Sequence, residues 1–336
     1  MGTHTVRAGE NLTVIAKKYG YPDWRTIYND PKNADFRRKR PNPNLILPGD
    51  LLFIPDKTPI PAPPVFKVEF SLTVFDKHSS GRFPNLTLTL ILPNGTTKVV
   101  KTDKDGAVKL VEPDITAGKV NILSIVDNSA SPDIYYPAYV SSGLTTNASH
   151  VLHVPNKRKV ADEIAAAHGI TRRSSWGKRK PNYLKMDADW DYEIVAIHHS
   201  GDGGSKDPVE IETKHMTTKG YDDVGYHYMV KPNGDIYEGR YLWLKGSHVE
   251  KANTGKIGIL LMGDFEPQAI LDWNDDDPFP AQIAAAEKLI KTLKGKFATI
   301  TKMGGHKDYK KDTECPGSLL YAKIPGMRTN TGLSGP

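Results

Sequence analysis

The chain has 336 residues, of which 38% are hydrophobic and 25% charged, a formal net charge of +6 and a mean hydropathy of −0.47. This length allows two or three domains, and no apolar stretch approaches the ~20 residues that a membrane-spanning helix needs. A basic surface suits nucleic acid or the anionic bacterial wall, but no basic repeat is interleaved with aromatics, so we expect neither a nucleic-acid partner nor a membrane span.

Residues 1–55 carry the pattern of a small βααβ unit. After a short strand and a turn at Gly9, the spacing of Leu12, Ile15, Ala16 and Tyr19 predicts a helix with one apolar face. A second helix is expected over about Asp23–Asn29, and the turn Pro48-Gly49-Asp50 leads into a closing strand, Leu51–Ile54.

Two strings of this unit, VRAGENLTVIAKKYG and NLILPGDLLFIP, resemble a LysM module, a binder of glycans that contain N-acetylglucosamine. The resemblance implies a sugar groove formed by the loop before the first helix and the segment before the last strand. The residues that map to this groove are Gly9, Glu10, Asn11, Leu12, Leu45, Ile46 and Leu47. The stretch between the strings is longer and more basic than a minimal LysM, and its RRKR run (37–40) is either a solvated charge cluster or an anion site.

The next two segments differ in composition. Residues 56–65, DKTPIPAPPV, predict a stiff proline-rich linker. Residues 66–155 contain alternating β-rich runs and an Asn94-Gly95 hairpin signal. We expect a small antiparallel β-sandwich of immunoglobulin-like type, which serves as a spacer or docking domain and carries no chemistry.

Residues 156–336 predict an α/β domain. Asp207-Pro208 offers the start of a helix over about Pro208–Lys219, and a longer helix is expected over about Pro280–Phe297. GYHYMVKPNGDIYEG predicts a hairpin, and the apolar runs IVAI and KIGILLMG predict buried strands.

The only cysteine, Cys315, cannot form an internal disulfide. It lies nine positions after His306 in a loop-like string, GHKDYKKDTECPG. A single cysteine is commonly a small buried hydrophobe. Two imidazoles and one thiolate, however, are typical of a catalytic zinc site with an open fourth position.

A pair of histidines, His198 and His199, ends the apolar run Ile194–Ile197. Adjacent strand residues point to opposite faces of a sheet. At most one of the pair can therefore face a metal, and the spacing alone does not say which one.

Five stretches between about Arg172 and Tyr321 resemble the zinc-dependent N-acetylmuramoyl-L-alanine amidases, a group that includes phage amidase-type lysozymes and peptidoglycan recognition proteins. In order they are RRSSWGKRKP, IVAIHHSGD, DDVGYHYMVKPNGDIYEGR, GSHVEKANTGKIGILLMGDF and GGHKDYKKDTECPG. The resemblance implies a mixed sheet flanked by helices, with zinc at the bottom of a surface groove.

The resemblance also implies roles for individual residues. The zinc ligands map to His198, His306 and Cys315, the tyrosine beside the metal to Tyr226, and a second catalytic donor to Thr313. The His306–Cys315 loop is one residue longer than usual, which bears on Thr313. His248 and Asn253 map to the muropeptide groove. His199 is expected to have a structural role or to support the metal ligands from behind, and His215 and His227 to be structural or surface residues. Glu238 and Asp264 are open candidates for a carboxylate base.

The implied reaction is hydrolysis of the amide between the lactyl group of N-acetylmuramic acid and L-alanine, with zinc-activated water. Two alternatives stay open: a non-catalytic protein that binds or senses peptidoglycan, and a wall-attachment part of a phage tail or injection device. Recognition proteins without activity typically lose the cysteine ligand, which this chain keeps.

The N-terminal string MGTHTVRAGENL lacks the pattern of a secretory signal. We therefore expect synthesis in the bacterial cytoplasm and action on peptidoglycan after lysis or delivery by another route. An antibacterial effector carried by a secretion machine, with a machine component or an immunity protein as partner, is the preferred context over a phage lysin.

Overall fold

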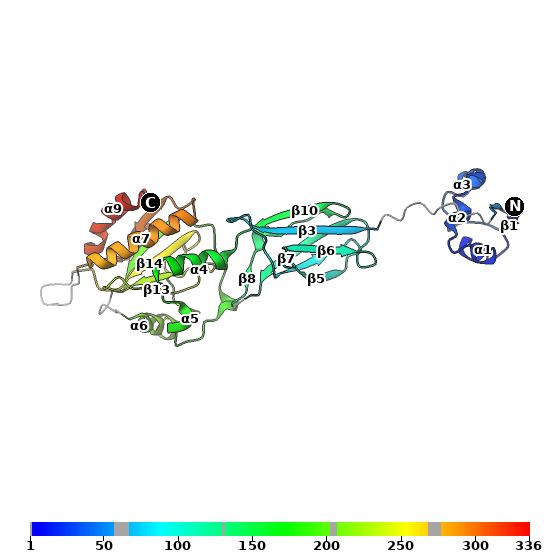
Figure 1. Ribbon diagram of the computed structural model, residues 1–336. Helices are drawn as coiled ribbons and strands as arrows, with labels where there is room; N and C mark the ends of the chain where they lie inside the picture. The colour runs from blue at the N-terminus through cyan, green and yellow to red at the C-terminus, as the bar shows by residue number, and fades with distance from the viewer. Residues whose placement is uncertain (1, 57–66, 130–131, 202–206, 268–276) are drawn as a thin grey trace. The chain divides into compact units, whose positions relative to one another are not determined.

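The computed structural model describes residues 2–56, 67–129, 132–201, 207–267 and 277–336 (Figure 1). The predicted linker falls almost wholly on residues 57–66, which lie outside the described residues. The chain divides into two compact units, Met1–Val68 and Glu69–Pro336. In the described part of the chain, no helix has the length and apolar character required to cross a bilayer.

The first unit pairs two short strands and packs helices against them. Its elements are β1 (Gly2–Thr5), α1 (Leu12–Lys18), α2 (Arg25–Tyr28), a 3₁₀ turn (Pro31–Asn33), α3 (Ala34–Lys39) and β2 (Leu51–Ile54). The strands are antiparallel, with Gly2 opposite Ile54. The Asn11 side chain caps α1 by accepting from the Val14 amide at 2.9 Å. The predicted βααβ order is present, with α3 as an addition.

The additional helix α3 contains most of the basic run. Arg37 donates to the backbone carbonyls of Tyr28 and Asp30 at 2.6 and 2.7 Å. Arg40 forms an ion pair with the buried carboxylate of Asp50 at 2.8 Å. Lys39 also pairs with Asp50, at 3.1 Å. Three of the four basic side chains therefore contact other parts of the unit, so the run is neither purely solvated nor a free anion site.

Eight strands follow in the second unit, arranged in two sheets. They are β3 (Glu69–Asp76), β4 (Leu86–Ile91), β5 (Thr97–Lys101), β6 (Ala107–Val111), β7 (Lys119–Asp127), β8 (Ile134–Tyr135), β9 (Leu144–Thr145) and β10 (Ser149–Val154). One sheet has the order β10-β3-β6 and the other β5-β4-β7-β8, with β9 also on β7. Alternate side chains of β3 and β4 are buried, as the period-2 pattern predicts.

The expectation of a purely antiparallel sandwich is wrong for one strand, because β10 pairs with β3 in parallel. Asn147, just before β10, exchanges two hydrogen bonds with Glu69, the first residue of β3. This contact places the beginning of β10 beside the beginning of β3, so the two strands run in the same direction.

The C-terminal part of this unit is built on a mixed five-stranded sheet, as the family resemblance implies. Its strands are β11 (Ile194–His199), β12 (Tyr228–Val230), β13 (Ile236–Glu238), β14 (Lys256–Leu261) and β15 (Lys302–Gly305), in the order β13-β12-β14-β11-β15. The β12–β13 hairpin is antiparallel and the other three pairings are parallel. Strand β11, which lies between β14 and β15, is buried along nearly its whole length.

Helices cover both faces of this sheet. They are α4 (Lys157–His168), α5 (Arg173–Trp176), α6 (Pro208–Thr213), α7 (Pro280–Lys296), α8 (His306–Tyr309) and α9 (Ser318–Thr331). One apolar core joins α4, α7 and α9 to Val195, Ile197 and Ile259. On the other face, Trp176 of α5 and Ile211 of α6 pack with Met229 and Leu260.

The helix predicted over Pro208–Lys219 changes its winding midway. Asp207 accepts from the Val209 amide at 2.8 Å, so the predicted cap is correct. The α-helix ends at Thr213, and Lys214–Thr218 continue as a π-helical turn that carries the buried His215. The imidazole of His215 accepts a hydrogen bond from the Gly225 amide at 3.0 Å, which ties this turn to the loop before β12.

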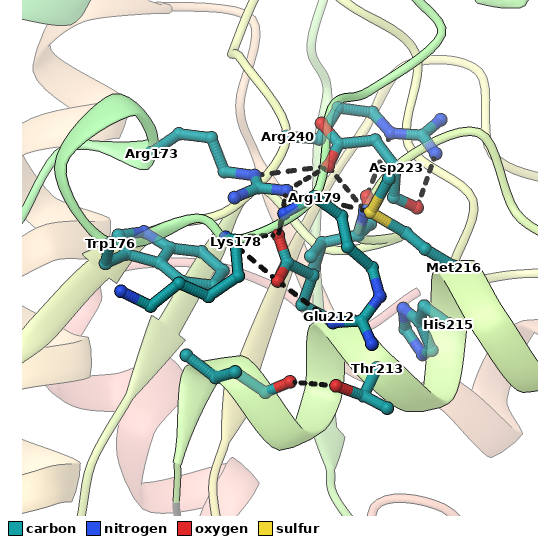
Figure 2. A network of polar contacts seen from close by, with 12 residues as sticks. Arg173, Trp176, Lys178, Arg179, Glu212, Thr213, His215, Met216, Asp223 and Arg240 are labelled. Carbon is teal, nitrogen blue, oxygen red and sulfur yellow. Dashed lines mark hydrogen bonds and ion pairs between the residues drawn. The ribbon is translucent and has the colours of Figure 1, made fainter.

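A buried ion network fixes the same loop from the other side (Figure 2). The Arg173 guanidinium, 3% exposed, contacts Glu212 at 2.7 Å and Asp223 at 3.0 Å, and both carboxylates are fully buried. Arg240 donates to the backbone carbonyls of Asp223 and Val224 at 3.3 and 3.0 Å. The chain that leads to Tyr226 is thus held in place by two guanidinium groups.

Removal of one member of a buried ion network leaves its partners charged and unpaired. We expect Arg173→Met to lower the free energy of unfolding by about 3–5 kcal/mol, measured by denaturant unfolding of the full chain. Arg179→Met is the matched control, because Arg179 also pairs with Glu212 but is 36% exposed, and it should cost about 1 kcal/mol or less. Equal losses in the two variants would contradict the assigned role of the network.

Candidate metal centre

The sheet brings two of the predicted ligands together. β11 and β15 are parallel neighbours in which Ile197 pairs with Gly305. His198 and His306 directly follow these paired residues, so both emerge at the same end of adjacent strands. Their ring centroids are 4.7 Å apart.

The third predicted ligand is supplied by the loop after α8. The Lys307 amide donates to the Cys315 carbonyl at 2.9 Å, which folds the loop back onto the beginning of α8. The Sγ atom of Cys315 then lies 3.6 Å from Nδ1 of His198.

His198, His306 and Cys315 form the one cluster of three potential metal ligands found among the described residues, with ligand atoms within 4.8 Å of one another. The Nε2 atom of His306 is buried and has no hydrogen-bond partner. A buried nitrogen without a partner is costly, and a metal ion would satisfy it. Two imidazole nitrogens and one thiolate fit zinc better than magnesium or calcium, which prefer oxygen ligands.

Burial keeps the cluster uncharged in the absence of a cation. It lowers the pKa of His198 well below its usual value and that of His306 to about 4, with Lys310 adding to the second shift. Burial raises the pKa of the Cys315 thiol to about 12, although a hydrogen bond with the His199 backbone acts in the opposite direction. The imidazoles are thus ready to coordinate, while the thiol would have to lose its proton to a bound cation.

His199 lies on the opposite face of β11, as strand geometry requires. Its Nδ1 accepts from the Phe265 amide at 3.3 Å and lies 3.7 Å from the Asp264 carboxylate. Of the histidine pair, it is His198 that the structure brings to the cluster.

Tyr226 stands beside the cluster. Its ring centroid is 5.0 Å from that of His198 and 5.2 Å from that of His215. Burial raises the pKa of Tyr226, and the nearby Cys315 adds to the shift. The phenol therefore keeps its proton at neutral pH and can act as a hydrogen-bond donor.

Thr313 is tied to the ligand loop: its Oγ1 accepts from the Cys315 amide at 3.3 Å. The two candidate carboxylates are engaged elsewhere. Glu238 accepts from Arg172 at 3.0 Å and from the Arg173 amide at 2.9 Å, and Asp264 adjoins His199. The cluster of potential ligands includes neither carboxylate.

His248 and Asn253, predicted in the muropeptide groove, occupy different positions. His248 is 7% exposed, and its Nδ1 lies 3.0 Å from Nε2 of His198. The Asn253 side chain accepts a hydrogen bond from the backbone amide of His248 at 2.8 Å. Asn253 also lines a cavity of about 280 Å³ together with Tyr221 and Arg240.

His215 has a closer relation to the site than its predicted structural role suggests. It holds the Gly225 amide and packs on Tyr226. Tyr226 lies 11 positions after His215, with a change from π-helix to loop between them. No periodicity could therefore indicate their contact.

The predicted glycan-groove residues of the first unit differ in the exposure of their side chains. Leu45 and Leu47 are 64% and 51% exposed, whereas Leu12 is 4% exposed and belongs to the core. The Leu12 side chain lies on the buried face of α1. The other predicted groove residues are Gly9 at φ +82°, Glu10 bonded to the Arg7 amide, the cap Asn11, and Ile46 packed on the core.

A cavity of about 970 Å³ is lined among others by Tyr183, Met186 and Trp243 and shares no residue with the ligand cluster. Size alone therefore does not identify the reactive site, and the convergence of two imidazoles and a thiol is the stronger indication.

The part of the chain that carries the cluster is similar to known proteins. The sequence profile of the family described as N-acetylmuramoyl-L-alanine amidase matches residues 189–318. Peptidoglycan-recognition protein LB of Drosophila melanogaster is 30% identical over 174 residues, 49% of this chain and 71% of that protein. Peptidoglycan-recognition protein 2 of Holotrichia diomphalia is 27% identical over 174 residues, 49% of this chain and 88% of that protein.

Among solved structures, the N-acetylmuramoyl-L-alanine amidase LysC from Clostridium intestinale matches 49% of this chain and 98% of its own length, with 24% identity and a TM-score of 0.41. The profile match contains His198, His306 and Cys315, and the match to the Drosophila protein exceeds two thirds of that relative's length. On these grounds, the chain belongs to the family of N-acetylmuramoyl-L-alanine amidases and peptidoglycan-recognition proteins.

Proposed function

We propose that this protein is a zinc-dependent peptidoglycan hydrolase that cleaves the amide between the lactyl group of N-acetylmuramic acid and L-alanine. The observation that carries the proposal is the convergence of His198, His306 and Cys315, in which the buried Nε2 of His306 has no protein partner. Family membership supports peptidoglycan as the substrate class.

In this proposal, His198, His306 and Cys315 hold the metal. When bound, zinc lowers the pKa of a coordinated water to about 7 and withdraws charge from a carbonyl oxygen. The chain supplies two neutral imidazoles and one thiolate, so the donor set retains an open position for water or substrate.

Tyr226 is the proposed donor toward charge that develops during the reaction. Its protonated hydroxyl lies beside the cluster, and a donor fixed in a water-poor site stabilises an oxyanion more effectively than water does. His215 and Arg240 hold the backbone of the two residues that precede Tyr226, Gly225 and Val224. Thr313 is assigned a supporting role, since its hydroxyl also orients the Cys315 amide.

The names of the relatives favour a second function, recognition of peptidoglycan without cleavage. The retained cysteine supports hydrolysis, because a receptor has no need for a buried thiol directed at two imidazoles. Assignment to a phage tail, an injection device or a secretion machine with its immunity protein remains a further proposal about biological context.

We also propose that the first unit is a LysM-type glycan binder that raises the concentration of the enzyme on its insoluble substrate. Its βααβ order supports this role, and so do the exposed side chains of Leu45 and Leu47. Apolar side chains in water offer a surface against which sugar rings can pack.

The metal assignment predicts zinc content directly. His198→Ala and Cys315→Ser should lose most of the bound zinc, measured by elemental analysis of purified full-length protein, because each variant removes one of only three protein ligands. His199→Ala is the matched control, because this side chain lies on the other face of the strand, and it should retain zinc. Full occupancy in the first two variants would refute the site.

The reaction predicts a specific product. The protein should release stem peptides with free L-alanine amino termini from purified peptidoglycan, and a chelator should stop the release. We expect Tyr226→Phe to lower turnover by ~10²-fold while zinc content is unchanged. Cuts within the peptide or the glycan would exclude the amidase reaction, and zinc binding without any cleavage would favour recognition alone.

The glycan-binding role predicts a separation of binding from chemistry. Leu45→Ser combined with Leu47→Ser should weaken co-sedimentation with whole sacculi, and deletion of residues 1–64 should weaken it further. Hydrolysis of small soluble muropeptides should be nearly unchanged in both variants. A parallel loss of both activities would show that the first unit is needed for the catalytic fold itself.

A further inference from the structure

The side of the His198 ring that faces away from Cys315 contacts a second buried histidine. The Nε2 atom of His198 lies 3.0 Å from Nδ1 of His248, while Nδ1 of His198 faces Cys315 at 3.6 Å. The two rings meet nearly edge to face, with centroids 4.9 Å apart and an interplanar angle of 82°. His198 thus uses one nitrogen toward the cluster and the other toward His248.

The contact made by the second ring nitrogen of His248 determines which of the two histidines donates in this hydrogen bond. Its Nε2 lies 3.3 Å from the backbone carbonyl of Lys256. A carbonyl oxygen can only accept, so this contact requires a proton on Nε2 of His248. In a neutral imidazole the other nitrogen is then an acceptor, and Nδ1 of His248 is directed at His198.

The same reasoning gives the position of the proton on the His198 ring. Because Nδ1 of His248 accepts, Nε2 of His198 must donate, and the proton of neutral His198 is therefore on Nε2. Its Nδ1 is left with a free lone pair on the side of Cys315. The chain of hydrogen bonds from the Lys256 carbonyl selects the tautomer that can coordinate a cation in the cluster.

The position of His248 is fixed independently of its ring nitrogens. Asn253 Oδ1 accepts from the backbone amides of both His248 and Val249, at 2.8 and 2.7 Å. A Cβ atom at Gly246 or Gly258 would lie 2.4 or 2.5 Å from the His248 ring. Two glycines therefore make room for this imidazole, and a histidine ring fills the space that they leave.

From this geometry we infer that His248 is a positioning residue that fixes the tautomer and ring orientation of the metal ligand His198. The inference rests on the proposed zinc site and adds to it a residue that does not touch the metal. Partners that hold the second nitrogen of a ligating histidine typically contribute about 10–100-fold in metal affinity.

The direct test is the zinc affinity of the full-length protein, measured by competition with a chromogenic chelator. His248→Leu removes the acceptor and should weaken zinc binding by about 10–100-fold. His248→Asn presents Oδ1 near the position of Nδ1 and should restore affinity to within about threefold of wild type. Unchanged affinity in His248→Leu, or equal loss in the leucine and asparagine variants, would overturn the inference.

His227 supplies a matched control for loss of packing. It is also fully buried, with its ring 5.8 Å from that of His248, and it bonds the Leu244 carbonyl and the Gly258 amide, not His198. His227→Leu should keep wild-type zinc affinity even where it lowers stability. A zinc loss equal to that of His248→Leu would mean that packing, not the hydrogen bond, is responsible.

A measurement on the unaltered protein keeps the inference testable if the leucine variant does not fold. With ¹⁵N-labelled histidine and bound zinc, the spectrum should show His198 protonated at Nε2 and coordinated through Nδ1. Coordination through Nε2 would overturn the inference. Absence of zinc binding by wild-type protein would instead refute the proposed function, so the two failures are distinguishable.

Discussion

The register between two parallel strands is the constraint on which the candidate site depends. Ile197 and Gly305 are partners in the β11–β15 ladder, and the residue after each is a histidine. A shift by one residue would turn His198 to the other face of the sheet, where His199 now contacts Phe265. Sheet hydrogen bonds thus determine which imidazoles meet, and the loop that carries Cys315 completes an arrangement already set by the core.

The surroundings of the cluster keep it in an uncharged, ordered state. The pKa values of both imidazoles are lowered by burial, and the pKa of the thiol is raised by it. Tyr226 follows a loop segment that is held by His215, through the Gly225 amide, and by the Arg240 guanidinium, through the Val224 carbonyl. The polar groups that determine geometry are buried, while Tyr226 and Cys315 remain partly accessible.

Strong local patterns made much of this protein predictable from its sequence. The apolar run before His198, the Asp207 cap and the Asn233-Gly234 hairpin all lie where the residues indicate. The family strings identified the three residues of the cluster, although 117 positions separate the first from the last. Features that the sequence did not reveal depend on long-range contacts. The parallel pairing of β10 depends on Asn147 meeting Glu69, and the burial of His248 depends on space left by Gly246 and Gly258. No periodicity or short motif in the sequence indicates such contacts between distant residues.

The three candidate ligands differ in how the fold depends on them. His198 belongs to β11 and His306 directly follows β15, whereas Cys315 belongs to a loop tied back by the Lys307 amide. Exchange of this single side chain would remove the thiol and leave the strand register, the two-sided helix layers and Tyr226 in place. A family built in this way can give rise to receptors from hydrolases, and loss of chemistry need not entail loss of the binding surface. Evolution of recognition from catalysis would then require one loop substitution and no new fold.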